Sequence, residues 1–202
     1  MSAHALARTL AAIAFAAFSG LPFAVQPLAA QPLAAGALTA AERAPTLDFT
    51  LTDQAGHPFT LSRQRGRAVV LFFGYTHCPD VCPTTLANLA HARSALGDAG
   101  RNVVVVFVTV DPRRDTPPVL REFVALFDRS FVGLTGTPER LAPVYRAYHV
   151  THRIAAEPAS ATGYNVSHTS LVYFIGRDGR LRGYGDWTDR PETFEQSLRE
   201  LL

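Results

Sequence analysis

Runs of apolar residues along the chain predict two buried β-strands with a helix between them. Unbroken apolar stretches occur within residues 67–75 and 102–110, and such runs are typical of strands that are covered on both faces. Between them, residues 83–96 carry apolar side chains at helical spacing, and Gly97 and Gly100 then close the helix. This order predicts two parallel strands joined by a right-handed crossover.

Shorter segments on both sides of this unit complete the predicted fold. Alternating runs at residues 48–52 and 58–61 surround a polar turn and indicate a β-hairpin. The remaining predicted elements are helices over residues 116–127, 137–149 and 191–202, and strands over residues 131–134, 167–175 and 181–184. The order of the elements predicts an α/β fold, a thioredoxin-like three-layer sandwich with a central mixed sheet and an N-terminal β-hairpin extension.

An uncharged apolar segment near the N-terminus predicts export. No charged side chain occurs from Thr9 to Ala41, and Arg8 precedes the most apolar part. This pattern is typical of a secretory signal peptide, with a cleavage site at the small residues 35–37, and the uncleaved segment is long enough to anchor the protein in a membrane. We therefore expect a protein of the bacterial periplasm, soluble or attached to the inner membrane through its N-terminus. The predicted parts are a signal peptide or membrane anchor, a tether and a folded domain, at residues 1–37, 38–45 and 46–202.

Composition and charge exclude several classes of function. The chain carries 19 basic and 17 acidic side chains, for a formal net charge of +2, and this near balance argues against a nucleic acid partner. All of the basic residues are Arg, which excludes Schiff-base and phosphate-loop chemistry that depends on Lys. Two cysteines are too few for a disulfide framework. Any role of the cysteines must therefore come from the pair itself.

The two cysteines, Cys78 and Cys82, follow the first buried strand at the point where the next helix begins. Ligands bind at the carboxyl ends of strands in open α/β sheets, and free N–H groups at a helix N-terminus favour the thiolate. At i and i+4 the two sulfurs converge on one side of the first helical turn. Such a pair suits Cu(I), with Zn as the generic competitor, or thiol–disulfide exchange. Redox proteins of this fold usually carry two residues between the cysteines, whereas three occur here.

A soft metal site with two sulfurs needs a third donor, and His168 is the best candidate. It opens the strand predicted over residues 167–175, so it should lie at the same sheet edge as the cysteine turn. Residues 151–166 contain Pro158 and Gly163 and predict a long loop that delivers His168 and becomes ordered when a metal binds. We expect the other candidates to be solvated, to cap a helix or to point away from the site: His77, His91, His149 and His152.

Four segments resemble the sequence signatures of the SCO/SenC copper proteins. Residues 74–83 closely resemble the first signature, which is highly specific, and residues 109–117 resemble the second. Residues 133–137 resemble the third, and residues 166–170 resemble the segment that carries the family's histidine. One departure is visible, because the family usually has Asp immediately before this histidine and the chain has Ser167. Loss of that carboxylate affects the expected metal affinity more than the identity of the site.

The resemblance implies that Cys78, Cys82 and His168 ligate copper, as Cu(I), Cu(II) or both. It also implies a metallochaperone, not an enzyme, that helps to metallate the binuclear copper centre of cytochrome c oxidase. The implied partners are the copper-site subunit of the oxidase and other copper carriers. Asp80, between the cysteines, and Asp111, at the end of the second buried strand, are candidates for supporting the ligands or docking a partner.

The same cysteines leave other activities open. An exported thiol–disulfide oxidoreductase that reduces the cysteines of the oxidase copper site needs only Cys78 and Cys82, whereas a trigonal copper site also needs His168. A peroxidase of the same fold needs activating Arg or Gln neighbours that the cysteine motif does not supply. Asp115 is predicted to cap the helix that follows it.

Overall fold

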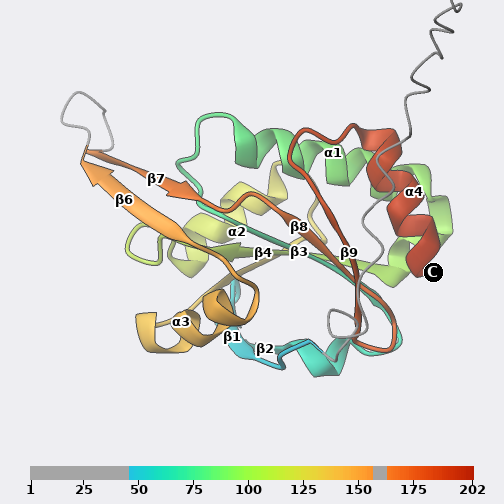
Figure 1. Cartoon of the computed structure of the whole chain (residues 1–202), viewed down its shortest axis with the longest axis horizontal. Coiled ribbons are helices and arrows are strands. Elements are labelled where there is room, and N and C mark those ends of the chain that lie inside the picture. The colour runs from blue at the N-terminus through green and yellow to red at the C-terminus, as the bar shows by residue number, and fades with distance from the viewer. Residues whose placement is uncertain (1–45, 157–162) are drawn as a thin grey trace, which may run out of the picture. The chain divides into compact units, whose positions relative to one another are not determined.

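A seven-stranded mixed sheet forms the centre of the fold in the computed structural model, which describes residues 46–156 and 163–202 (Figure 1). The strands are β1 (Thr50–Asp53), β2 (Pro58–Thr60), β3 (Ala68–Gly74), β4 (Val103–Thr109), β5 (Val132–Thr135), β6 (His152–Ala156), β7 (Tyr164–His168), β8 (Val172–Ile175) and β9 (Leu181–Gly185). The central sheet has the order β2-β1-β5-β4-β3-β8-β9, and β6 and β7 form a separate two-stranded sheet.

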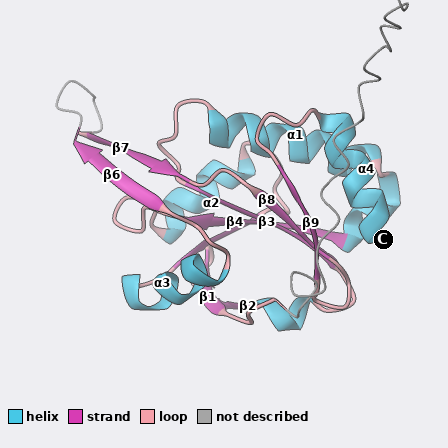
Figure 2. Cartoon of the chain, viewed as in Figure 1, coloured by secondary structure: helices cyan, strands magenta, loops and turns pink. Residues whose placement is uncertain are grey.

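Helices cover both faces of the central sheet (Figure 2). The α-helices are α1 (Val81–Ala95), α2 (Pro117–Ala125), α3 (Pro138–Ala147) and α4 (Pro191–Leu201), and short 3-10 helices span Leu61–Gln64 and Gly97–Asn102. Phe123 of α2 packs on Phe107 of β4, on the face that α1 and α4 also cover. Tyr145 of α3 packs on Phe73 of β3, on the opposite face. This arrangement confirms the predicted three layers.

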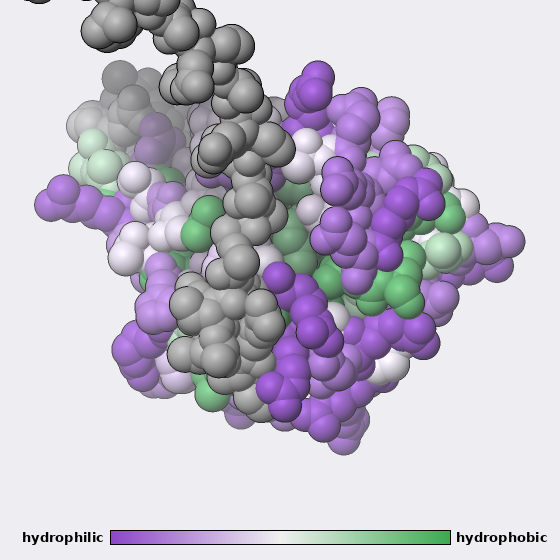
Figure 3. Space-filling view, turned by 45° about the vertical axis from the view of Figure 1, so that its right-hand side comes forward, coloured by the Kyte–Doolittle hydropathy of each residue, from purple (hydrophilic) through white to green (hydrophobic). Residues whose placement is uncertain are grey.

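The predicted strand, helix and strand unit forms the core of the sheet. β3 and β4 are parallel and in register from Ala68 opposite Val103 to Gly74 opposite Thr109, and every residue of both strands is buried. Full burial on both faces explains why their apolar runs are unbroken. Figure 3 shows mainly hydrophilic side chains on the visible surface of the described residues, with a smaller hydrophobic area among them. Because the strands are parallel, the segments that follow β3 and β4 meet at one edge of the sheet.

The segment predicted as a long loop, residues 151–166, contains most of a β-hairpin instead. β6 and β7 pair antiparallel, with His152 opposite His168 and Ala156 opposite Tyr164. The prediction was wrong because all five residues of β6 are exposed, so the strand has no buried apolar alternation to reveal it. The strand predicted over residues 167–175 is correspondingly divided: His168 ends β7, and β8 begins at Val172.

Most other predicted elements are confirmed with shifted ends. The N-terminal hairpin is present, and β1 also pairs antiparallel with β5, so the hairpin extends the central sheet. The first helix begins at Val81 rather than at residue 83, which places Cys82 inside its first turn. The C-terminal hairpin of β8 and β9 and the terminal helix are also present.

The predicted signal peptide or anchor and the tether, residues 1–45, lie outside the described residues. In the described parts of the chain, none of the helices has the length and apolar character that a membrane span requires.

Candidate metal centre

The two cysteines lie together at the N-terminus of α1. Cys78 belongs to the turn after β3, and its N–H donates to the carbonyl of Tyr75 at 3.2 Å. Cys82 lies in the first turn of α1 and donates its own N–H to the Cys78 sulfur at 3.4 Å. Both are free thiols; Cys78 is partly exposed and Cys82 is fully buried. The predicted convergence of the two sulfurs on one helical turn is therefore present.

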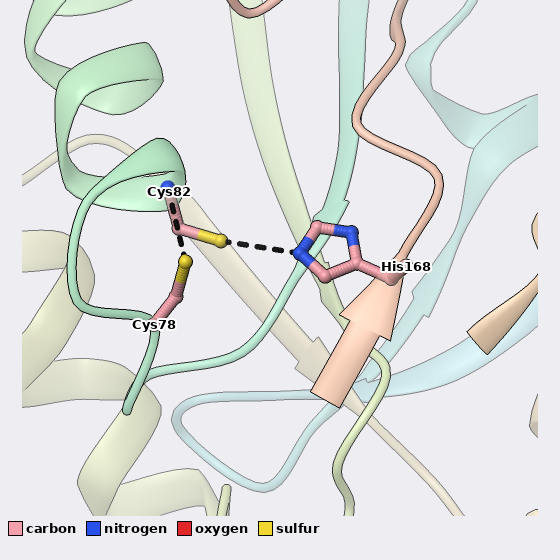
Figure 4. Close-up of side chains that lie close together, drawn as sticks. All are labelled: Cys78, Cys82 and His168. Atoms are coloured by element: carbon pink, nitrogen blue, oxygen red, sulfur yellow. Dashed lines mark hydrogen bonds between the residues drawn. The ribbon is translucent and has the colours of Figure 1, made fainter. Parts of the chain in front are cut away.

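His168 approaches the two sulfurs from the end of β7 (Figure 4). Its Nε2 lies 3.6 Å from the Cys82 sulfur, and the ligand atoms of Cys78, Cys82 and His168 all lie within 4.8 Å of one another. The Nδ1 of His168 lies 2.9 Å from the carbonyl oxygen of Thr169. Because a carbonyl only accepts, Nδ1 carries the proton and Nε2 presents its lone pair to the sulfurs. This backbone carbonyl orients the ring, and Ser167 is exposed.

The hydrogen bond between the two cysteine side chains shifts their pKa values in opposite directions. A hydrogen bond from the Cys82 thiol lowers the pKa of Cys78 to about 4, and the N–H of Cys82 adds to this effect against the opposing effect of burial. The same bond raises the pKa of Cys82, as do its burial and the negative charge of Cys78. Cys78 is therefore the thiolate at neutral pH, and Cys82 would become one if a metal ion displaced its proton.

Asp115 fixes the turn that carries Cys78. This fully buried carboxylate accepts hydrogen bonds from the N–H of Thr76 at 3.1 Å, the hydroxyl of Thr76 at 2.7 Å and the hydroxyl of Thr109 at 2.6 Å. Burial nevertheless raises the pKa of Asp115. The predicted helix cap is wrong, because Thr116 occupies the N-cap of α2 and no side chain caps that helix. Asp115 instead joins the cysteine turn to the end of β4.

Asp111 anchors the hairpin that carries His168. Its buried carboxylate pairs with Arg114 and accepts a hydrogen bond from the Tyr164 hydroxyl at 2.9 Å. Arg114 also donates to the Tyr164 carbonyl at 3.1 Å, and its guanidinium lies 3.6 Å from the centre of the Tyr164 ring. The same guanidinium lies 5.7 Å from the centre of the Tyr75 ring. The cluster thus links the segment after β4 to the first residue of β7.

The other predicted candidates lie around the site or away from it. Asp80 is the N-cap residue of α1, is exposed, and accepts a hydrogen bond from the Thr84 hydroxyl at 3.3 Å. The four remaining candidate histidines are exposed and are not part of the ligand cluster: His77, His91, His149 and His152.

Arg114, Tyr164 and the clamping role of Asp115 were not predicted from the sequence. Arg114 and Asp115 lie in residues 109–117, and the resemblance of this segment to the second family signature was the only sequence signal for them. Tyr164 lies outside all four signature segments. No spacing rule indicates that these residues contact the cysteine turn or the hairpin.

An open cleft gives access to the three candidate ligands. It has a volume of about 270 Å³ and includes Cys78, Asp80, Ser167 and His168 in its walls, together with Tyr75 at one side. Cys82 is not among the lining residues, in agreement with its burial. A metal ion held here would be reached from the side of Cys78 and His168.

The fold and the three side chains define a thioredoxin-like protein with a two-cysteine, one-histidine site. The family model of SCO1/SenC matches residues 39–202, and the chain belongs to this family. The resemblance seen in the four sequence signatures is therefore confirmed.

Similar proteins come from bacteria and eukaryotes. Protein SenC of Rhodobacter capsulatus is 39% identical over 155 residues, which is 70% of this chain and 66% of SenC. An SCO2-like protein of Rickettsia prowazekii is 35% identical over 132 residues, which is 65% of this chain and 64% of that protein. Both matches thus span just under two thirds of the relatives' own lengths.

Solved structures show the same architecture. Bradyrhizobium japonicum ScoI with copper bound has a TM-score of 0.71 and 36% identity, over 79% of this chain and all of that one (100%). Yeast Sco1 with copper bound has a TM-score of 0.68 and 29% identity, over 77% of this chain and 88% of that one.

Proposed function

We propose that this protein is a copper metallochaperone, which carries one copper ion as cargo between the Cys78 sulfur, the Cys82 sulfur and Nε2 of His168. The observation that supports this most directly is the meeting of these three donor atoms within 4.8 Å. Thiolate sulfur selects Cu(I), and imidazole nitrogen also suits Cu(II), so the donor set fits copper in either state. The copper-bound ScoI and Sco1 structures, which share this fold, support the same assignment.

The proposed acceptor is the binuclear copper centre of cytochrome c oxidase, with other copper carriers as the source of the ion. The open cleft supports such a transfer, because an incoming ligand can approach the copper beside Cys78 and His168 without opening the core. The proposed place of action is the bacterial periplasm, in soluble or membrane-anchored form, and the uncharged apolar segment from Thr9 to Ala41 supports export.

The test compares His168→Ala with the matched control His91→Ala, which removes an exposed histidine away from the cluster. We expect His168→Ala to lower Cu(II) affinity by more than about 100-fold, since loss of even an outer partner of a ligand costs roughly 10–100-fold. Oxidase assembly in cells should fall with it, whereas the control should behave as wild type. Wild-type Cu(II) binding and oxidase assembly in His168→Ala would refute the proposal.

A second candidate function is thiol–disulfide exchange with the cysteines of the oxidase copper site. The partly exposed Cys78, whose pKa is lowered, supports it, because the attacking species in such exchange is a thiolate. Exchange requires Cys78 and Cys82 but no imidazole, so His168→Ala should retain disulfide reductase activity. A variant that loses copper but assembles oxidase normally would favour this second function over the first.

A further inference from the structure

β6 has an unpaired edge whose hydrogen-bonding groups can be assigned. Among the described strands it pairs only with β7. Thr169 donates its N–H to the Thr151 carbonyl, and hydrogen-bonded pairs recur at every second residue of an antiparallel ladder. The N–H and C=O groups of Arg153 therefore face β7, whereas those of His152 and Ile154 point to the opposite edge. Figure 1 shows β6 on the outer side of its hairpin, with α3 on the same side of the molecule.

An apolar pocket of about 340 Å³ lies against this edge. The side chains of His152 and Ile154 form one wall, and Leu141 and Tyr145 of α3 are among the residues opposite. The rings of His152 and Tyr145 are in edge contact, with 5.0 Å between their centres, while Ile154 is 50% exposed. The residues that direct backbone groups to the free edge thus also line the pocket, so a strand added at this edge would pass beside it.

The exposed charges on both faces of the free edge are basic. Arg113 lines the pocket and is exposed, whereas the exposed Arg153 lies on the opposite face of β6 from His152 and Ile154, because successive side chains of a strand alternate between its faces. The only carboxylate among the lining residues is that of Asp111, which is buried and paired with Arg114. The β6 sequence contains no Pro, one of the residues that commonly protect an exposed edge from pairing, and Arg153 is its only Asp, Glu, Lys or Arg side chain. Two copies of β6 would bring their Arg153 side chains together, which disfavours pairing with a second copy of the chain.

We propose that the free edge of β6 binds an extended segment of a partner protein in which large apolar side chains are flanked by carboxylates. The segment pairs with the backbone of His152 and Ile154 and places an apolar side chain in the pocket. Its alternate side chains are carboxylates on the opposite face, where Arg153 lies, and the positive charge of Arg113 at the pocket adds to the attraction. The surface is distinct from the copper ligands but adjoins them, since His152 is directly opposite His168 in the hairpin. Peptide binding does not require copper, so this proposal and the proposed function fail independently.

The probe is the blocked peptide acetyl-Glu-Phe-Glu-Val-Glu-amide, titrated into the ¹⁵N-labelled protein. We expect a dissociation constant of about 0.1–1 mM, as for a short unconstrained strand, with the largest amide shifts at His152 and Ile154. The same peptide with Lys in place of Glu should bind at least about tenfold more weakly, which corresponds to roughly 1.4 kcal/mol.

Ile154→Pro tests the backbone pairing, because it removes a donor from the free edge but none from the β7 ladder. It should weaken binding at least about tenfold, while Ile154→Val, the control, stays within about twofold of wild type. Wild-type copper binding would show that the proline has not disturbed the position of His168. Arg113→Glu, which leaves β6 unchanged, should weaken the acidic peptide and strengthen the Lys peptide.

Three results would each overturn the proposal. The first is no binding of the acidic peptide up to about 5 mM, well above the expected range. The second is binding with amide shifts away from β6. The third is concentration-dependent self-association that Ile154→Pro abolishes, because the edge would then serve a second copy of the chain.

Discussion

Replacing Gly74 by Ala should disturb the metal site through a single methyl group. Gly74 is the last residue of β3, and it lies next to the side chain of the buried Cys82. A Cβ atom at this position would lie 2.6 Å from the Cys82 sulfur and 2.7 Å from Cε2 of Phe107. Favourable contacts between such atoms need about 3.5–4.0 Å, so roughly 1 Å of space is missing on each side. Phe107 is fully buried and packs against Phe72 and Phe123, which leaves it little room to move.

The methyl group must therefore displace the Cys82 sulfur, the backbone of β3, or both. Overpacking of this kind costs about 1–3 kcal/mol, and we expect the free energy of unfolding to fall by that amount. A displaced sulfur also changes its distance to Cys78 and His168, so copper affinity should fall in the folded variant. Gly183→Ala is the matched control, because Gly183 also lies in a strand but has no atom within 4 Å of the place that a Cβ would occupy.

Urea unfolding of the copper-free, reduced proteins measures the stability change, and competition with a Cu(I) chelator measures affinity. Both should change in Gly74→Ala and neither should fall in Gly183→Ala. If Gly74→Ala matched its control in stability and affinity, the Cys82 sulfur and the Phe107 ring could make room for a methyl group at no cost, and the reasoning would be refuted.

Two further predictions concern the support and ionisation of the cysteines. Asp115→Ala should lower the free energy of unfolding by about 2–4 kcal/mol, because it leaves the donors of the half-buried Thr76 and the buried Thr109 without their acceptor. Urea unfolding against the exposed-residue control Asp98→Ala checks this, and equal stability of the two variants would contradict it. Alkylation of Cys78 should be nearly independent of pH between about 6 and 8, since its pKa is lowered to about 4, whereas an ordinary thiol reacts faster as pH rises toward about 8.5. In Cys82→Ala, which removes the largest cause of that shift, the rate should rise with pH over the same range, and a flat profile there would contradict the assigned cause.

The parts of the fold that could be predicted from the sequence are those in which burial controls the residue pattern. β3 and β4 are buried at every position, so their apolar runs identified them, and their parallel pairing followed from the helix between them. The cysteine pair was equally accessible to prediction, because its geometry depends on the spacing of two residues in one helical turn. His168 was placed at the correct edge of the sheet although the strand assigned to it was wrong.

The features that could not be predicted depend on contacts between distant segments. Asp115 reaches Thr76 across 39 residues, and Tyr164 reaches Asp111 across 53 residues, and neither pair has a local spacing that a pattern could reveal. β6 is equally hidden, because an exposed strand that pairs with one neighbour has no buried face to impose alternation.

The error at residues 151–166 changes the expected energetics of metal binding. A loop that becomes ordered around the metal would lose conformational entropy, which opposes binding. In the structure His168 ends a β-strand instead, and Tyr164 at the other end of that strand is held by Asp111 and Arg114. The Thr169 carbonyl also fixes the ring of His168 with Nε2 toward the sulfurs. Because these contacts preorganise the histidine, less ordering accompanies binding, whereas removal of the proton from Cys82, whose pKa is raised, opposes it.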